Sequence, residues 1–138
     1  SSIINDKPID VYNNGEMYRD FTYVDDLVYG ISSLIDVIPD LNLKNNNLFS
    51  DSLSPVAPYR VVNIGNSNKV KLLDFIEIIE EILGKKAIRN YMPMQKGDLS
   101  STWADTTLLQ NLIGNQKQTN LKHGVANFIN WFKEYYNL

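Results

Sequence analysis

Residues 72–84 carry the clearest helical pattern in the chain. Large apolar side chains recur there every three or four residues, which is the spacing of an amphipathic helix. Gly84 follows the last of them, where helices commonly end in a left-handed residue. The pattern predicts a helix over residues 72–83. Three acids of this segment are predicted to lie on its solvated face: Glu77, Glu80 and Glu81.

Shorter patterns predict the other elements. Four segments rich in β-branched and aromatic residues predict strands, at 8–12, 19–24, 59–64 and 85–91. Three further helices are predicted to begin at capping residues: Asp25, Asp105 and Asn120. The order of strands and helices predicts an α/β or α+β fold, in which about four helices pack on a small sheet of short strands.

Length and composition limit the classes of function. The 138 residues are predicted to form a single domain, 1–138, with a surface loop at 40–58 that is rich in Asn, Ser and Pro. Acidic residues outnumber basic ones, 16 to 13, which argues against a nucleic-acid partner. No apolar run approaches the ~18 residues that a membrane span needs. The absence of cysteine is compatible with a reducing compartment, and we expect a cytoplasmic protein.

The sequence offers no catalytic centre. It has no glycine-rich dinucleotide loop after a strand, and no tyrosine is followed four residues later by a lysine. His123 is predicted to be a polar residue in the first turn of the last helix rather than a base. No cluster of residues has metal-ligand spacing. We therefore predict no catalytic, cofactor-binding or metal-ligating residue.

Two segments are harder to explain by packing alone. In MYRDFTYVDDLV, Arg19 lies between aromatic residues, and its planar guanidinium suits two phosphate oxygens. The alternative is an ion pair with Asp20 or Asp25. In MQKGD, Gly97 allows a close backbone approach, and Asp98 could accept hydrogen bonds from a vicinal diol. The alternative is an ordinary turn.

Taken together, four motifs resemble one family. RDFTYVDDLV, YRVVNIGNSNKVKLLDFIEIIEEILGKKA, MPMQKGDLSSTWADTTLLQNLIG and NLKHGVANFINWFKEYY cover nearly all of residues 7–136. They resemble the C-terminal, substrate-binding part of the extended short-chain dehydrogenase/reductases that act on nucleotide sugars. Among these enzymes, the UDP-glucuronate 4-epimerase branch is the nearest match.

The resemblance implies roles for five residues. Arg19 stands at the position that contacts the nucleotide diphosphate, and Asp98 at the position that binds the uridine ribose hydroxyls. Tyr12 stands where an aromatic ring lies against uracil. Gln95 and Lys96 occupy the place of a second arginine that meets the phosphates in many relatives. Gln95 carries no charge, and Lys96 could substitute as a point charge.

The resemblance also implies a function. The chain would be the C-terminal nucleotide-sugar-binding fragment of an NAD-dependent epimerase of polysaccharide biosynthesis, without the Rossmann domain that binds NAD. We expect the chain to bind a UDP-sugar, to bind no cofactor and to be inactive alone. Without the N-terminal NAD-binding domain it would expose an apolar face and self-associate. Two alternatives remain, namely a fragment of another UDP-, dTDP- or GDP-sugar epimerase or dehydratase, and a stand-alone non-catalytic nucleotide-binding or interaction module.

Overall fold

The computed structural model describes residues 1–40 and 51–138, which form two compact units. Unit 1 contains Ser1–Phe21, Asn68–Thr102 and Thr119–Leu138, and unit 2 contains Thr22–Ser67 and Trp103–Gln118. The predicted surface loop at 40–58 lies largely outside the described residues. Its described part after position 50 contains no helix or strand.

Unit 1 holds two pairs of short strands. β1 (Ile9–Val11) and β4 (Arg89–Tyr91) are parallel, with Val11 opposite Tyr91. β2 (Tyr18–Asp20) and β3 (Lys69–Lys71) are antiparallel, with Arg19 opposite Val70. A single turn of 3-10 helix, η1 (Tyr12–Gly15), follows β1, as the Asn-Asn-Gly sequence there favours.

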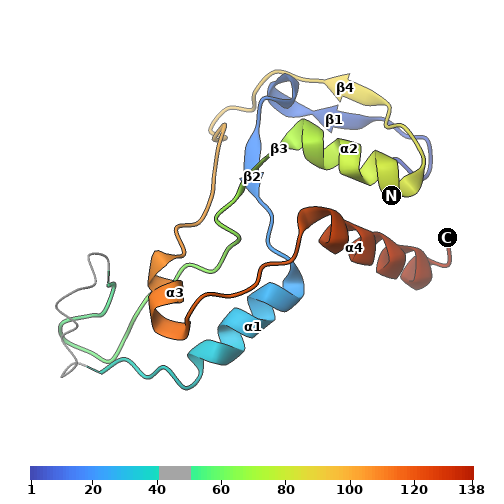
Figure 1. Ribbon diagram of the computed structural model, residues 1–138. Coiled ribbons are helices and arrows are strands. Elements are labelled where there is room, and N and C mark those ends of the chain that lie inside the picture. The colour runs from blue at the N-terminus through green and yellow to red at the C-terminus, as the bar shows by residue number, and fades with distance from the viewer. Residues whose placement is uncertain (41–50) are drawn as a thin grey trace. The chain divides into compact units, whose positions relative to one another are not determined.

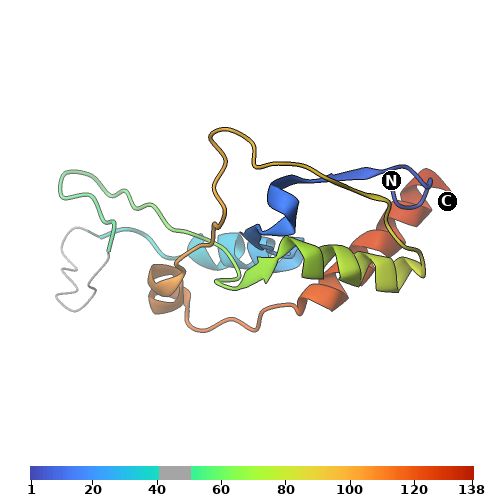
Figure 2. The same cartoon turned by 90° about the horizontal axis from the view of Figure 1, so that it is seen from above.

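Two helices complete unit 1. α2 (Leu72–Leu83) follows β3 directly and runs beside the β1–β4 pair, and α4 (Leu121–Tyr136) packs against it (Figures 1 and 2). Ile76 of α2 is buried, as are Val125 and Ile129 of α4. The predicted ends of both helices are confirmed. Gly84 is left-handed at the end of α2, and the side chain of Asn120 accepts the Lys122 amide at 3.0 Å.

The prediction that Glu80 lies on a solvated face is wrong. Its side chain is 1% exposed and accepts hydrogen bonds from Lys86 Nζ at 2.7 Å and Arg89 Nη2 at 2.9 Å. The backbone amide of Ala87 donates a third bond at 3.1 Å. Glu77 and Glu81 are exposed as predicted. Glu80 therefore fastens the end of α2 to β4, because the chain folds back after Gly84 and brings two cations onto this carboxylate.

Unit 2 contains α1 (Val24–Leu34) and α3 (Thr107–Ile113), which pack against each other. The predicted helices are present, but Asp25 does not cap α1. The helix begins at Val24, so Asp25 lies in its first turn, where the helix dipole favours an acid. Asp105 does stand at the start of α3, where its carboxylate accepts the Thr107 amide at 2.9 Å.

The predicted strand at 59–64 is wrong. This segment belongs to no ladder, and β3 occupies the corresponding place in the element order. Its start turns back on nearby residues instead, since the Ser54 amide donates to the Tyr59 carbonyl at 2.8 Å and Arg60 pairs with Asp51 at 2.8 Å. Ile64 at its end packs on Gly30 of α1. A strand needs an extended neighbour, and the described residues of unit 2 provide none.

The predicted fold class is confirmed: residues 1–40 and 51–138 contain four helices and short strands in an α/β arrangement. None of the helices in the described ranges has the length and apolar character required to cross a membrane.

Candidate functional site

Tyr12 and the segment after β4 leave the β1–β4 pair at the same edge. The strands are parallel, so their carboxyl ends coincide. The Met92 amide donates to the Val11 carbonyl at 2.9 Å, and the Asn14 amide donates to the Met92 carbonyl at 3.1 Å. These bonds hold the half-buried Tyr12 beside the start of the loop at 92–98. This edge is where ligands bind in many α/β proteins.

A tight turn follows in that loop. The Asp98 amide donates to the Gln95 carbonyl at 3.3 Å, and Gly97 has a φ of 85°. A Cβ at Gly97 would meet nothing within 4 Å, so the left-handed backbone rather than crowding favours glycine here. Gln95 and Lys96 are exposed on this turn, where they are available to a ligand.

Arg19 and Asp98 form a direct ion pair. Arg19 Nη2 donates to Asp98 Oδ1 at 2.9 Å, although the two residues are 79 positions apart in the sequence. Each side chain is about one-third exposed, 31% for Arg19 and 33% for Asp98, so solvent and ligands can reach both. Arg19 therefore pairs with Asp98 rather than with Asp20 or Asp25, the partners that the sequence suggested.

Backbone carbonyls add two contacts that no sequence pattern could reveal. Arg19 Nη1 donates to the carbonyls of Tyr18 and Leu99, both at 2.9 Å. The arrangement presents the guanidinium of Arg19, from β2, beside the carboxylate of Asp98, which lies on a loop that starts next to the ring of Tyr12. This combination suits an anionic group next to a diol and a flat base. The roles of Tyr12, Arg19, Gln95, Lys96 and Asp98 toward a ligand stay predictions.

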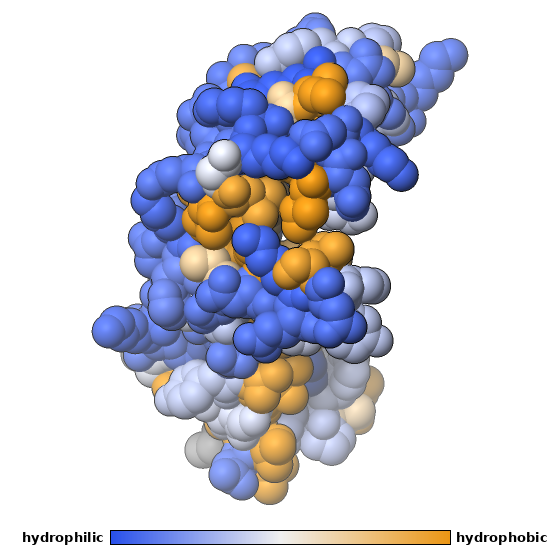
Figure 3. Space-filling view, turned by 90° about the vertical axis from the view of Figure 1, so that its right-hand side faces the viewer, coloured by the Kyte–Doolittle hydropathy of each residue, from blue (hydrophilic) through white to orange (hydrophobic). Residues whose placement is uncertain are grey.

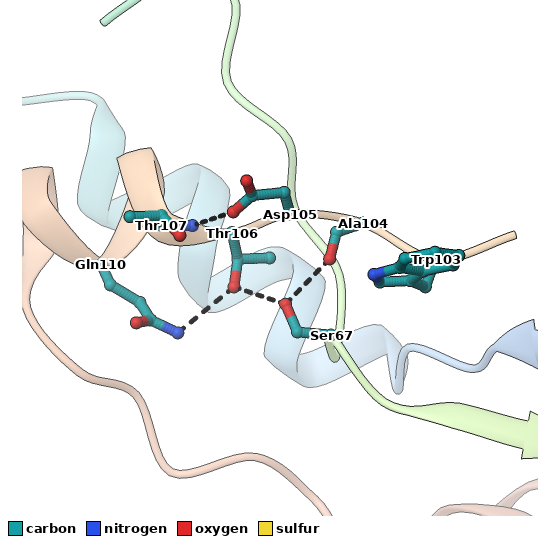
Figure 4. Close-up of a pocket in the computed structure, with 7 residues that line it drawn as sticks. All are labelled: Ser67, Trp103, Ala104, Asp105, Thr106, Thr107 and Gln110. Carbon is teal, nitrogen blue, oxygen red and sulfur yellow. Dashed lines mark hydrogen bonds between the residues drawn. The ribbon is translucent and has the colours of Figure 1, made fainter. Parts of the chain in front are cut away.

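Unit 2 contains an open cavity of about 500 Å³ near the start of α3 (Figure 4). Its polar groups bond to one another. Ser67 Oγ bonds to the Ala104 carbonyl at 2.9 Å and to Thr106 Oγ1 at 2.7 Å, and Gln110 Nε2 donates to Thr106 Oγ1 at 3.2 Å. Hydrogen bonds from the side chain and the amide of Thr107 lower the pKa of Asp105. Since these groups satisfy each other, they hold Ser67 against α3 and leave few polar atoms for a ligand.

His123 lies in the first turn of α4, as predicted, with its Nε2 atom 3.3 Å from Asn127 Nδ2. Across the described ranges, no group of three or more His, Asp or Glu side chains could hold a metal ion.

No protein-family profile matches the chain. Among curated proteins, Protein CapI of Staphylococcus aureus is 45% identical over 98% of the chain. A protein of Rhizobium meliloti named "Probable UDP-glucuronate 4-epimerase" is 43% identical, again over 98% of the chain. The chain spans 40% of the length of each of these relatives.

A solved structure has the same fold. The UDP-glucuronic acid 4-epimerase of Bacillus cereus, in complex with UDP-glucuronic acid and NAD, superimposes with a TM-score of 0.75 at 27% identity. The match covers 98% of this chain and 38% of the enzyme. These likenesses confirm the resemblance that the four motifs indicate. The chain is related along nearly its whole length to part of the UDP-glucuronate 4-epimerases, members of the extended short-chain dehydrogenase/reductases that act on nucleotide sugars.

Proposed function

We propose that this chain supplies the nucleotide-side contacts of a UDP-glucuronate 4-epimerase and has no catalytic set of its own. The observation that carries the proposal is the ion pair, at 2.9 Å, between Arg19 of β2 and Asp98 at the end of the loop at 92–98. Their residue types suit a diphosphate and a ribose, which are adjacent groups in a UDP-sugar. The names of the relatives support this choice of substrate. A cytoplasmic location stays a prediction.

In this proposal the five predicted residues contact the base, the ribose and the diphosphate of the nucleotide. Tyr12 lies against uracil, Asp98 accepts hydrogen bonds from the ribose hydroxyls, and Arg19 binds the diphosphate. Lys96 adds positive charge from the exposed turn, and Gln95 can offer only a neutral hydrogen bond.

The described residues do not fit NAD. β2 leads into α1 through residues 21–23 and β3 leads directly into α2, and neither junction contains a glycine. The connection from β4 to α3, residues 92–106, contains the single glycine Gly97 and no glycine-rich motif. A dinucleotide loop requires glycines between a strand and a helix, so that the backbone can approach the pyrophosphate. We therefore assign NAD and the proton-transfer residues to the part of the relatives' length that this chain does not match. Conversion of UDP-glucuronate by the purified chain in the presence of NAD would contradict the proposal.

The exposed apolar side chains of unit 2 support the proposal that another domain packs against it in the whole enzyme. Among its described residues only one large apolar side chain, Leu109, is buried. The apolar face of α1 is between 38% and 59% exposed, and it consists of Val24, Leu27, Val28 and Ile31. Ile35, the residue that follows the helix, is 73% exposed. Figure 3 shows one face of the molecule, on which apolar patches lie among polar side chains. We propose that the NAD-binding domain covers the apolar face of α1 in the whole enzyme.

Binding of UDP tests the nucleotide site. We expect isothermal titration calorimetry to detect UDP binding by the chain, and Arg19→Ala to weaken it about tenfold or more. A charge-assisted hydrogen bond to phosphate is worth about 1.5–3 kcal/mol, and about 1.4 kcal/mol is tenfold. Arg60→Ala is the matched control, because Arg60 also pairs with an aspartate, Asp51, but in unit 2. Equal UDP affinities of the Arg19→Ala variant and the native chain would remove Arg19 from the site.

Exposure of the α1 face predicts self-association of the isolated chain. Sedimentation velocity is expected to show species larger than a monomer, and the double substitution Val28→Lys and Ile31→Lys is expected to return the chain to monomer. Lysines disrupt the association because their charges resist burial in an apolar contact. Ser32→Lys adds one charge instead of two, at the edge of this row of side chains, and should disrupt the association less. A monomeric native chain would count against the prediction.

A further inference from the structure

The guanidinium of Arg19 forms hydrogen bonds within the chain and keeps N–H donors for a ligand. Its three hydrogen bonds run from one guanidinium to Asp98 Oδ1 and to the carbonyls of Tyr18 and Leu99, each at 2.9 Å. A guanidinium has five N–H donors, so two remain. Within the part of the chain that the structure describes, these two, the Nε–H and the second Nη2–H, have no partner. Arg19 can therefore keep its present bonds and still donate to an anion.

Apart from the side chain of Arg19, few hydrogen bonds hold the segment that carries Asp98 against β2. The Tyr18 amide donates to the Ser100 carbonyl at 2.8 Å, and the Thr102 amide donates to the Tyr18 carbonyl at 3.2 Å. Both bonds lie after Asp98 in the chain. Before that point, the turn starting at Gln95 is held by its own amide-to-carbonyl bond of 3.3 Å. The side chain of Arg19 is thus what ties Asp98 and Leu99 to β2.

One oxygen of Asp98 is already committed by these contacts. Oδ1 accepts from Arg19 and also from the Leu99 amide at 2.7 Å. Two donors on a single oxygen fix the plane of the carboxylate and leave Oδ2 for another donor. The direction in which Asp98 presents Oδ2 therefore depends on Arg19.

We infer that Arg19 is a positioning residue for Asp98, so that it controls recognition of the ribose in addition to contacting phosphate. The inference rests on the proposed function, because it takes Asp98 as the ribose acceptor. It differs from that function in assigning Arg19 an effect on a ligand that contains no phosphate at all. A residue that met only the diphosphate could not change the affinity for a nucleoside.

Uridine is the probe that separates these two roles, because it has the base and the ribose but no phosphate. We expect Arg19→Lys, which keeps the charge but cannot form the same planar fork, to weaken uridine binding about fivefold. Asp98→Asn should weaken uridine binding as well, since it alters the acceptor itself. Arg60→Lys makes the same exchange in the Arg60–Asp51 pair of unit 2 and should change nothing. Weaker uridine binding in Asp98→Asn but not in Arg19→Lys would overturn the inference and leave the proposed function standing.

Hydrogen–deuterium exchange gives a second readout that needs no ligand. In Arg19→Lys we expect the amides of Asp98 and Leu99 to exchange at least severalfold faster than in the native chain, with those of α4 unchanged. The Arg60→Lys variant should match the native chain throughout residues 95–102. If the native chain binds neither UDP nor uridine, the proposed function fails, and exchange alone decides whether Arg19 positions Asp98. Unchanged exchange at both amides in Arg19→Lys would overturn the inference.

Discussion

Replacing Glu80 by glutamine is expected to lower the free energy of unfolding by about 3 kcal/mol or more. The carboxylate is almost fully buried and receives donors from Lys86, Arg89 and Ala87. Glutamine has one acceptor oxygen, and its amide group would place further N–H donors against these cations. Lys86 is 86% exposed and stays solvated in the variant, but Arg89 is only 20% exposed and would lose its counterion. Removing one member of a buried, hydrogen-bonded ion pair costs about 3–5 kcal/mol.

The next residue along α2 supplies the control. Glu81 pairs with Lys122, but their side chains are 62% and 55% exposed. Exposed pairs contribute about 0–1 kcal/mol, so Glu81→Gln should leave the urea unfolding midpoint nearly unchanged. Equal losses of stability in Glu80→Gln and Glu81→Gln would contradict the role assigned to the buried carboxylate.

The carboxylate of Glu80 also makes the free energy of unfolding depend on pH. The Lys86 hydrogen bond, followed by those of Arg89 and Ala87, lowers the pKa of Glu80 from 4.5 to about 2, against the opposing effect of burial. Because the pKa is lower in the folded state, the stabilisation is complete above pH 4.5 and is lost as the pH falls from 4.5 to about 2. In urea titrations at stepped pH, the native chain should therefore lose its advantage over Glu80→Gln in that window. A constant difference down to pH 2 would contradict this.

Local patterns predicted the helices well, because a helix satisfies its backbone within one segment. The apolar spacing of 72–83, Gly84 and the cap at Asn120 each act over a few residues, and all three are confirmed. The strand predicted at 59–64 failed for the opposite reason. Its β-branched residues favour extended backbone, but a strand also needs a neighbour that composition cannot name.

Local patterns also failed to predict which charged side chains pair with each other. Helical spacing placed Glu80 with Glu77 and Glu81, yet the return of the chain after Gly84 buries it beneath Lys86 and Arg89. The motifs selected Arg19 and Asp98 separately, each for its own chemistry. Their ion pair depends on tertiary contacts between β2 and a loop 79 residues away, which no local pattern encodes.

Gly15→Ala is expected to lower the free energy of unfolding by about 3 kcal/mol and to disturb the turn that carries Tyr12. Gly15 has a φ of 84°, and a Cβ there would lie 2.5 Å from Leu73 Cδ2 and 2.6 Å from Leu73 Cγ. The left-handed backbone costs a non-glycine residue about 1–2 kcal/mol, and overpacking costs about 1–3 kcal/mol more. Since η1 ends at Gly15, a shift that relieves the clash would move Tyr12 and weaken UDP binding in the same variant.

Two further variants separate the backbone cost from the crowding. Gly84 has a φ of 64° with nothing within 4 Å of its Cβ position, so Gly84→Ala should cost only about 1 kcal/mol. In a double-mutant cycle of Gly15→Ala with Leu73→Ala, the smaller side chain removes the clash but not the backbone cost. In urea unfolding, the double variant should therefore lose about 1–2 kcal/mol less free energy of unfolding than the two single variants lose together. Strictly additive losses would show that Leu73 does not restrict position 15, and the crowding explanation would fail.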